Sequence, residues 1–118
     1  MNQYTDGLVV VLKRDCPTCT LLEPVYGELA GSGAPLLVIS QDDPTFPESI
    51  VGVVDDVDLE RSYRLDIETV PTLIRMEGGN EVARRIGWHR DEWRELTGLE
   101  SLGEGLPDYR PGCGSMSV

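Results

Sequence analysis

The sequence predicts an α/β fold, and three observations lead to that prediction. Two short apolar runs, residues 8–13 and 36–39, flank a segment with helical periodicity. A strand, a helix and a second strand within about 30 residues form one βαβ unit. Further along, two strand-like segments enclose a glycine turn and precede a last helical pattern. The chain has 118 residues, which suits one domain with a single core.

The first half of the chain follows the βαβ pattern element by element. Both strands are apolar throughout rather than alternating, as expected when both faces of a parallel sheet are covered. A helix is predicted from residue 17 to about residue 30, because its apolar residues recur at helical spacing: Leu21, Leu22, Val25 and Leu29. Pro17 suits the first helical turn, and Pro24 predicts a kink inside the helix. Gly31, Ser32 and Gly33 then end the helix.

The middle of the chain carries weaker patterns. Residues 41–47 read as a loop by their turn chemistry. Residues 50–54 fit either a short edge strand or a packed loop. Acidic residues then crowd the start of a short predicted helix over residues 57–65, where they complement the helix dipole.

The last predicted elements are a hairpin and a helix. Residues 70–76 read as a strand with a proline at its beginning, and residues 81–86 return as an alternating strand after a glycine turn at 78–80. Residues 90–99 predict a final helix. Residues 103–118 show no periodicity, so the sequence predicts a domain over residues 1–102 and an irregular tail or linker over 103–118.

Composition narrows the classes of partner. The net charge is −11, and Lys13 is the single lysine. Such acidity argues against nucleic acid and anionic membranes as general partners. No apolar run approaches the roughly 20 residues of a membrane span. The first residues lack the pattern of a signal peptide, and we therefore expect a cytoplasmic protein.

The most informative motif is Cys16-Pro17-Thr18-Cys19, at the junction of the first strand and the first helix. Unpaired N–H groups at a helix start stabilise a thiolate there. In a reducing compartment, such a close cysteine pair is more often catalytic or metal-binding than structural. The motif therefore predicts thiol–disulfide exchange, without a cofactor.

Together these features resemble the thioredoxin superfamily over residues 7–99. The resemblance rests on four segments in order: the motif Cys16-Pro17-Thr18-Cys19, Pro24 five positions after Cys19, Thr69-Val70-Pro71-Thr72 at a strand start, and Gly78-Gly79-Asn80 followed by Ile86-Gly87. It implies a thioredoxin-like fold, with a central mixed sheet flanked by helices, and a thiol-disulfide oxidoreductase activity.

The resemblance also implies residue roles. Cys16 would be the nucleophile and Cys19 the resolving thiol. Val70 and Pro71 resemble the cis-proline segment that presents backbone to a substrate, and Gly87 would line the same groove. Lys13 would add positive charge near the thiol. The implied partners are a disulfide-containing protein or a small thiol substrate, and thioredoxin reductase or glutathione as electron donor.

Departures from the family pattern keep two alternatives open. Asp15 replaces the usual tryptophan before the first cysteine, and Val10 occupies the position of the buried acid. The order Cys-Pro-Xaa-Cys with Lys13 upstream resembles glutaredoxins, so a glutathione-dependent reductase is one alternative. A redox-inactive binding or chaperone module of the same fold is the other.

The last expectations from the sequence concern metal binding by the cysteines and the role of Cys113. Cys16, Cys19, His89 and Cys113 would suffice in number for a zinc site, but their spacing is irregular, and we predict no metal. Cys113 lies in the setting Gly112-Cys113-Gly114. It is interpreted mainly as an incidental tail cysteine; the alternatives are a thiol that exchanges with Cys16 or part of a second redox site.

Overall fold

Five strands form a central mixed sheet in the order β3-β2-β1-β5-β6. The computed structural model describes residues 6–116, so residues 1–5 of the predicted domain and 117–118 of the predicted tail lie outside it. The strands of this sheet are β1 (Gly7–Leu12), β2 (Leu36–Ser40), β3 (Val54–Asp55), β5 (Thr72–Glu77) and β6 (Asn80–Ile86). Strands β1 and β2 are parallel, whereas β5 runs antiparallel to β1 and to β6. The α/β class and the mixed sheet match the prediction.

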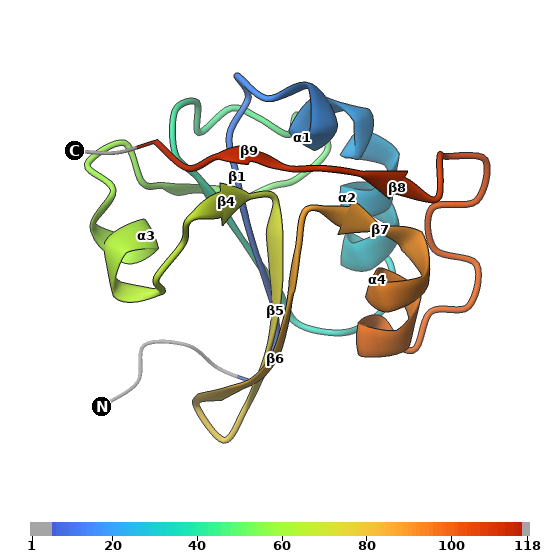
Figure 1. Ribbon diagram of the computed structural model, residues 1–118. Coiled ribbons are helices and arrows are strands. Elements are labelled where there is room, and N and C mark those ends of the chain that lie inside the picture. Colours follow the sequence, from blue (N-terminus) through green and yellow to red (C-terminus); the bar gives the residue numbers. More distant parts are fainter. Residues whose placement is uncertain (1–5, 117–118) are drawn as a thin grey trace.

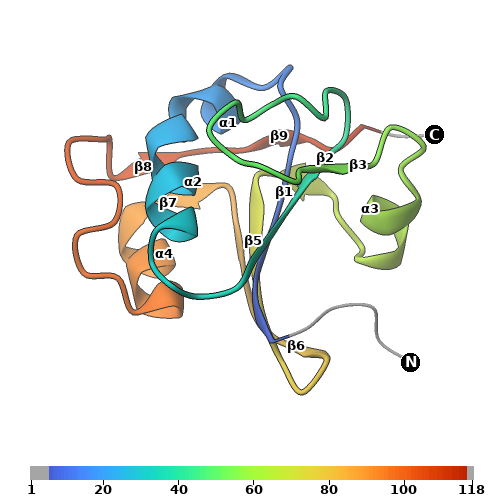
Figure 2. The ribbon, with the colours of Figure 1, turned by 180° about the vertical axis from the view of Figure 1, so that it is seen from behind.

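Helices cover both faces of the sheet. They are α1 (Pro17–Leu21), α2 (Glu23–Ala30), α3 (Glu60–Arg64) and α4 (Arg90–Thr97). Figure 1 shows α2 and α4 on one side of the sheet and α3 on the other, and the view from behind in Figure 2 agrees. Because both faces are covered, β1 is buried along its length apart from Gly7. This burial explains why its sequence is apolar throughout.

The predicted kink in the first helix is a complete break. Leu22 separates α1 from α2, with a backbone ψ of 8° that is not helical. Pro24 lies two residues later, in the first turn of α2. Proline has no N–H for the preceding turn and its ring clashes there, so the helix restarts instead of continuing. Leu22, Val25 and Leu29 all face the core.

The final helix is held by two tryptophans. Trp88 and Trp93 are fully buried, and their rings meet edge to face at 5.1 Å between centroids. The indole of Trp93 donates to the carbonyl oxygen of Gly87 at 2.9 Å. Gly98 ends α4 in the left-handed conformation, with φ of 74°, which glycine adopts without a steric cost.

The segment predicted as an irregular tail is instead ordered against the fold. Its described part forms two short strands, β8 (Tyr109–Arg110) and β9 (Cys113–Gly114). Strand β8 pairs with β7 (Trp88–His89), and β9 pairs with β4 (Thr69–Val70), both antiparallel. Figure 1 shows this segment crossing the end of the sheet from α4 towards α3. The prediction failed because these strands are two residues long and pair with distant backbone, which leaves no local pattern.

Within residues 6–116, no helix has both the length and the apolar character needed to cross a membrane.

Candidate functional site

Cys16 lies where the chain leaves β1 and enters α1. Its backbone is extended, with φ of −156° and ψ of 114°, and it is the residue that caps the helix. Its Sγ accepts a hydrogen bond from the backbone N–H of Cys19 at 3.4 Å. The same sulfur lies 3.8 Å from the carbonyl oxygen of Val70. An N–H aimed at sulfur stabilises a thiolate, so this position suits a nucleophile.

Cys19 lies one turn into the helix and is fully buried. Burial raises the pKa of this thiol from an ordinary 9.0 to about 12, and the Asp42 carboxylate adds to the rise. Lys13 acts in the opposite direction without offsetting the burial. The hydroxyl of Tyr26 donates to the carbonyl oxygen of Cys19 at 3.0 Å and fixes this turn of the helix. Cys19 is therefore a shielded, protonated thiol.

The disulfide joins Cys16 to Cys113, not to Cys19 as the motif predicted. The two Cα atoms are 5.9 Å apart, although 97 residues separate them in sequence. Cys19 remains a free thiol. The bond is possible because β9 pairs with β4 and places Cys113 opposite Val70, beside the Cys16 sulfur. The interpretation of Cys113 as an incidental tail cysteine is therefore wrong.

The segment around Cys113 lies very close to the Val70–Pro71 segment. Gly112 has no room for a side chain, because a Cβ atom there would lie 2.5 Å from the carbonyl oxygen of Val70. It would lie equally close to the Thr69 side chain. The Val70–Pro71 peptide bond is cis, and the Pro71 carbonyl accepts from the Gly87 N–H at 2.8 Å.

Three of the four residues predicted to bind substrate, Lys13, Val70 and Gly87, lie against the C-terminal segment (residues 103–116). Lys13 donates from its ammonium group to the carbonyl oxygen of Gly114 at 2.8 Å. A Cβ atom on Gly87 would lie 3.0 Å from the backbone nitrogen of Gly112. Cys113 is the register partner of Val70. The groove that the sequence predicts for a substrate is thus occupied by residues of the chain itself.

Sequence reasoning missed two residues of this site, Gln41 and Asp42, and did not foresee the partner of Thr18. Thr18 donates from its hydroxyl to the carbonyl oxygen of Pro111 at 2.7 Å. Gln41 is fully buried, and its amide donates to the hydroxyl of Ser115 at 2.7 Å. Asp42 accepts from the backbone N–H groups of residues 14 and 15, at 2.7 and 2.9 Å, and so fixes the loop before Cys16. The loop at 41–47 gave no signal for these contacts, because their partners lie far away in sequence.

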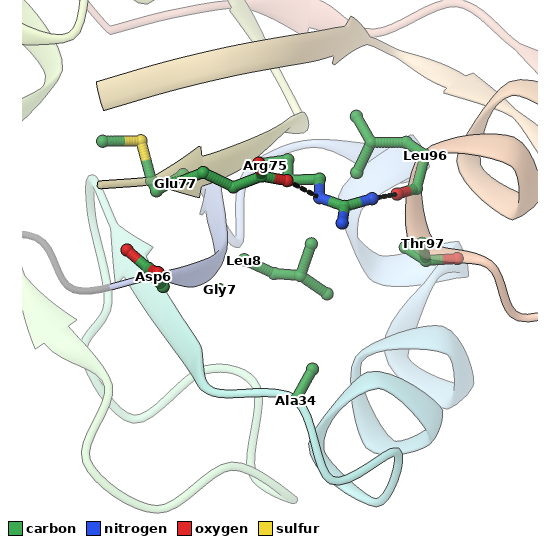
Figure 3. Close-up of a pocket in the computed structure, with 9 residues that line it drawn as sticks. Asp6, Gly7, Leu8, Ala34, Arg75, Glu77, Leu96 and Thr97 are labelled. Atoms are coloured by element: carbon green, nitrogen blue, oxygen red, sulfur yellow. Dashed lines mark hydrogen bonds and ion pairs between the residues drawn. The ribbon is translucent and has the colours of Figure 1, made fainter. Parts of the chain in front are cut away.

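No group of three or more His, Cys, Asp or Glu residues among residues 6–116 is placed to hold a metal ion. A hollow of about 510 Å³ lies at the far end of β1, around Gly7 and Leu8 (Figure 3). The guanidinium of Arg75 in this hollow is already bound to Glu77 and to the carbonyl oxygen of Leu96. The hollow is separated from Cys16 by the length of β1.

Comparison with known proteins supports the resemblance to thioredoxins. The chain is 31% identical over 78 residues to Thioredoxin H2-1 of Oryza sativa subsp. japonica. The match spans 65% of this chain and 47% of the rice protein, so the chain covers about half of that relative. The reduced thioredoxin pre-protein of Schistosoma mansoni is 21% identical, with a TM-score of 0.56 over 81% of each chain.

The chain has the thioredoxin-like fold. No protein-family model matches it. Within this thioredoxin-like fold, the Cys16 sulfur lies at the end of the sheet where β1 passes into α1, next to the cis bond before Pro71.

Proposed function

We propose that the chain is a thiol-disulfide oxidoreductase that reduces disulfides in proteins or small molecules. The observation that carries the proposal is the occupied groove. An extended, cysteine-containing segment pairs with β4 and is bonded through its cysteine to Cys16. A substrate held as a mixed disulfide would need the same two interactions, strand addition and a bond to Cys16.

The chemistry begins at Cys16. Its thiolate, stabilised by the N–H of Cys19, attacks one sulfur of the substrate disulfide and expels the other as a thiolate. The substrate then remains bonded to Cys16. In the scheme that the motif predicts, the Cys19 thiol loses its proton and attacks the Cys16 sulfur. The second substrate thiolate leaves, and a Cys16–Cys19 disulfide remains.

The groove supplies the binding groups. Val70 and Pro71 would offer backbone to an extended substrate, Gly87 would allow close approach, and Lys13 would donate to a substrate carbonyl. Val70, Gly87 and Lys13 now each contact the C-terminal segment. Regeneration needs an electron donor, and thioredoxin reductase and glutathione are the two candidates.

Reduction of insulin by dithiothreitol tests the proposal. The wild-type protein should accelerate precipitation of the insulin B chain, and Cys16→Ser should abolish the acceleration. A Glu104→Ala variant, altered at an exposed position, is the matched control and should behave like the wild type. Absence of acceleration by the wild type would leave a redox-inactive binding module as the better description. Faster turnover with glutathione and a glutathione mixed disulfide than with insulin would favour the glutaredoxin-type alternative.

A further inference from the structure

The C-terminal segment is held in place by many contacts besides the disulfide. The indole of Trp88 donates to the carbonyl oxygen of Pro107 at 2.7 Å, and the Arg90 backbone N–H donates to that of Asp108 at 2.8 Å. Beyond Cys113, the Ser115 backbone N–H donates to the Glu68 carbonyl oxygen at 3.0 Å. Contacts on both sides of Cys113 therefore set its position independently of the bond to Cys16.

These anchors restrict the positions that Cys113 can occupy relative to Cys16. Residues up to Asp108 are fixed near Trp88, so only a few residues separate the anchor from Cys113. A reactive group on such a short tether has an effective concentration on the order of millimolar. A thiol at Cys113 would therefore meet Cys16 more often than a dilute external thiol does.

The two partners available to Cys16 differ in accessibility. Cys113 is half-buried, between two glycines, and its sulfur reaches Cys16. Cys19 is fully buried behind Cys16. An attacking thiol has to become a thiolate, and burial of Cys19 disfavours the charged form. The shielded position of Cys19 thus makes it the slower partner.

We propose that Cys113 is a catalytic residue, the thiol that resolves the mixed disulfide formed on Cys16. The inference rests on the proposed function and replaces Cys19 in its second step. The Cys113 thiolate attacks the Cys16 sulfur, the Cys16–Cys113 bond forms, and the bond from Cys16 to the substrate breaks. The substrate sulfur leaves as a thiolate and takes a proton from water.

The electron balance is that of one disulfide exchanged for another. The thiols of Cys16 and Cys113 give up two electrons, and the substrate disulfide becomes two thiols. An external dithiol, dithiothreitol in the assay, then reduces the Cys16–Cys113 bond. Pairing of β9 with β4 displaces a substrate strand from the same edge, so release of the thiolate and release of the strand are coupled.

The test measures how long the mixed disulfide lives. Reduced protein is mixed with a fluorescent symmetric peptide disulfide, and the Cys16–peptide adduct is followed by acid quench and intact mass. The Cys19→Ser variant should clear the adduct within about threefold of the wild-type rate. Cys113→Ser should clear it about tenfold more slowly or worse, and the double variant should trap it.

A second variant keeps the Cys113 thiol but prevents docking. Gly112→Ala places a Cβ atom 2.5 Å from the Val70 carbonyl oxygen. It should slow clearance as Cys113→Ser does, whereas the control Glu104→Ala should not. Peptide mapping of the wild type after one turnover should find the Cys16–Cys113 bond.

Three outcomes would overturn the proposal. They are trapping in Cys19→Ser with normal clearance in Cys113→Ser, normal clearance in both single variants, and normal clearance in Gly112→Ala. Each of these leaves the proposed oxidoreductase function standing, because the adduct still forms and turns over. Failure of every variant, the wild type included, to form an adduct would instead refute both.

Discussion

The burial of Cys19 predicts an unusually unreactive thiol. In the protein with the Cys16–Cys113 bond intact, Cys19 is the free cysteine. Alkylation of this oxidised protein therefore reports on Cys19 alone. Its side chain is fully buried, and burial raises its pKa to about 12. Iodoacetamide reacts with the thiolate, so the labelling rate follows the thiolate fraction.

The size of the effect follows from the two pKa values. At pH 8, a cysteine with the ordinary pKa of 9.0 is about one tenth thiolate. A thiol with a pKa of about 12 is thiolate in only about one molecule in 10⁴ at that pH. The folded protein should therefore be labelled about 10³-fold more slowly than the unfolded chain. Between pH 8 and pH 10, its rate should rise about tenfold per pH unit without levelling.

The assay is a labelling time course on the oxidised protein, with intact mass as the readout. The same protein in concentrated urea, with its disulfide retained, provides the unfolded reference. A native rate that levels off near pH 9, or a native rate within about tenfold of the reference, would refute this reasoning. Either result would mean that the Cys19 thiol meets solvent as an ordinary cysteine does.

Three further predictions concern stability. Replacing Cys113 by serine should lower the unfolding free energy of the oxidised protein by about 4 to 5 kcal/mol, since the bond spans 97 residues. Urea unfolding with and without dithiothreitol checks this. With dithiothreitol, the wild type and Cys113→Ser should differ little in unfolding free energy. Folding raises the pKa of Cys19 from 9.0 to about 12, so the folded state holds this proton more tightly. The stabilisation of the folded state by this bound proton is complete below pH 9 and is lost as the pH rises towards 12. Between these pH values, the unfolding free energy of the wild type should fall about 1.4 kcal/mol per pH unit more steeply than that of Cys19→Ala. Asp42→Asn weakens two bonds to backbone N–H groups before Cys16 and should cost about 1 to 3 kcal/mol in the same urea assay.

The parts of the fold that the sequence predicted are those with local patterns. The apolar run of β1, the proline that ends α1 and the glycine turn before β6 each act through neighbouring residues. Boundaries differ most where tertiary contacts decide them. The helix predicted over 57–65 is confined to Glu60–Arg64, because Leu59 adopts a left-handed backbone with φ of 63°.

The candidate site was predictable only in part. The position of Cys16 follows from a strand that ends in a helix start, and Val70, Pro71 and Gly87 follow from the resemblance. The pairing of Cys16 with Cys113 does not, because it depends on strand pairing across most of the chain. Gln41 illustrates the same limit, since it reads as a loop residue and is in fact buried against Ser115.

The contacts in the groove also explain why the C-terminal segment carries so little sequence signal. Thr18 and Lys13 each donate to a main-chain carbonyl of the segment, on opposite sides of Cys113. Main-chain carbonyls are present in any sequence, so these contacts demand an extended backbone and not particular side chains. A steric demand is added at Gly112, where a Cβ atom would meet the Val70 carbonyl. A short segment with a glycine before its cysteine meets both demands without periodicity or hydrophobic pattern, and the fold, not the local sequence, gives it its structure.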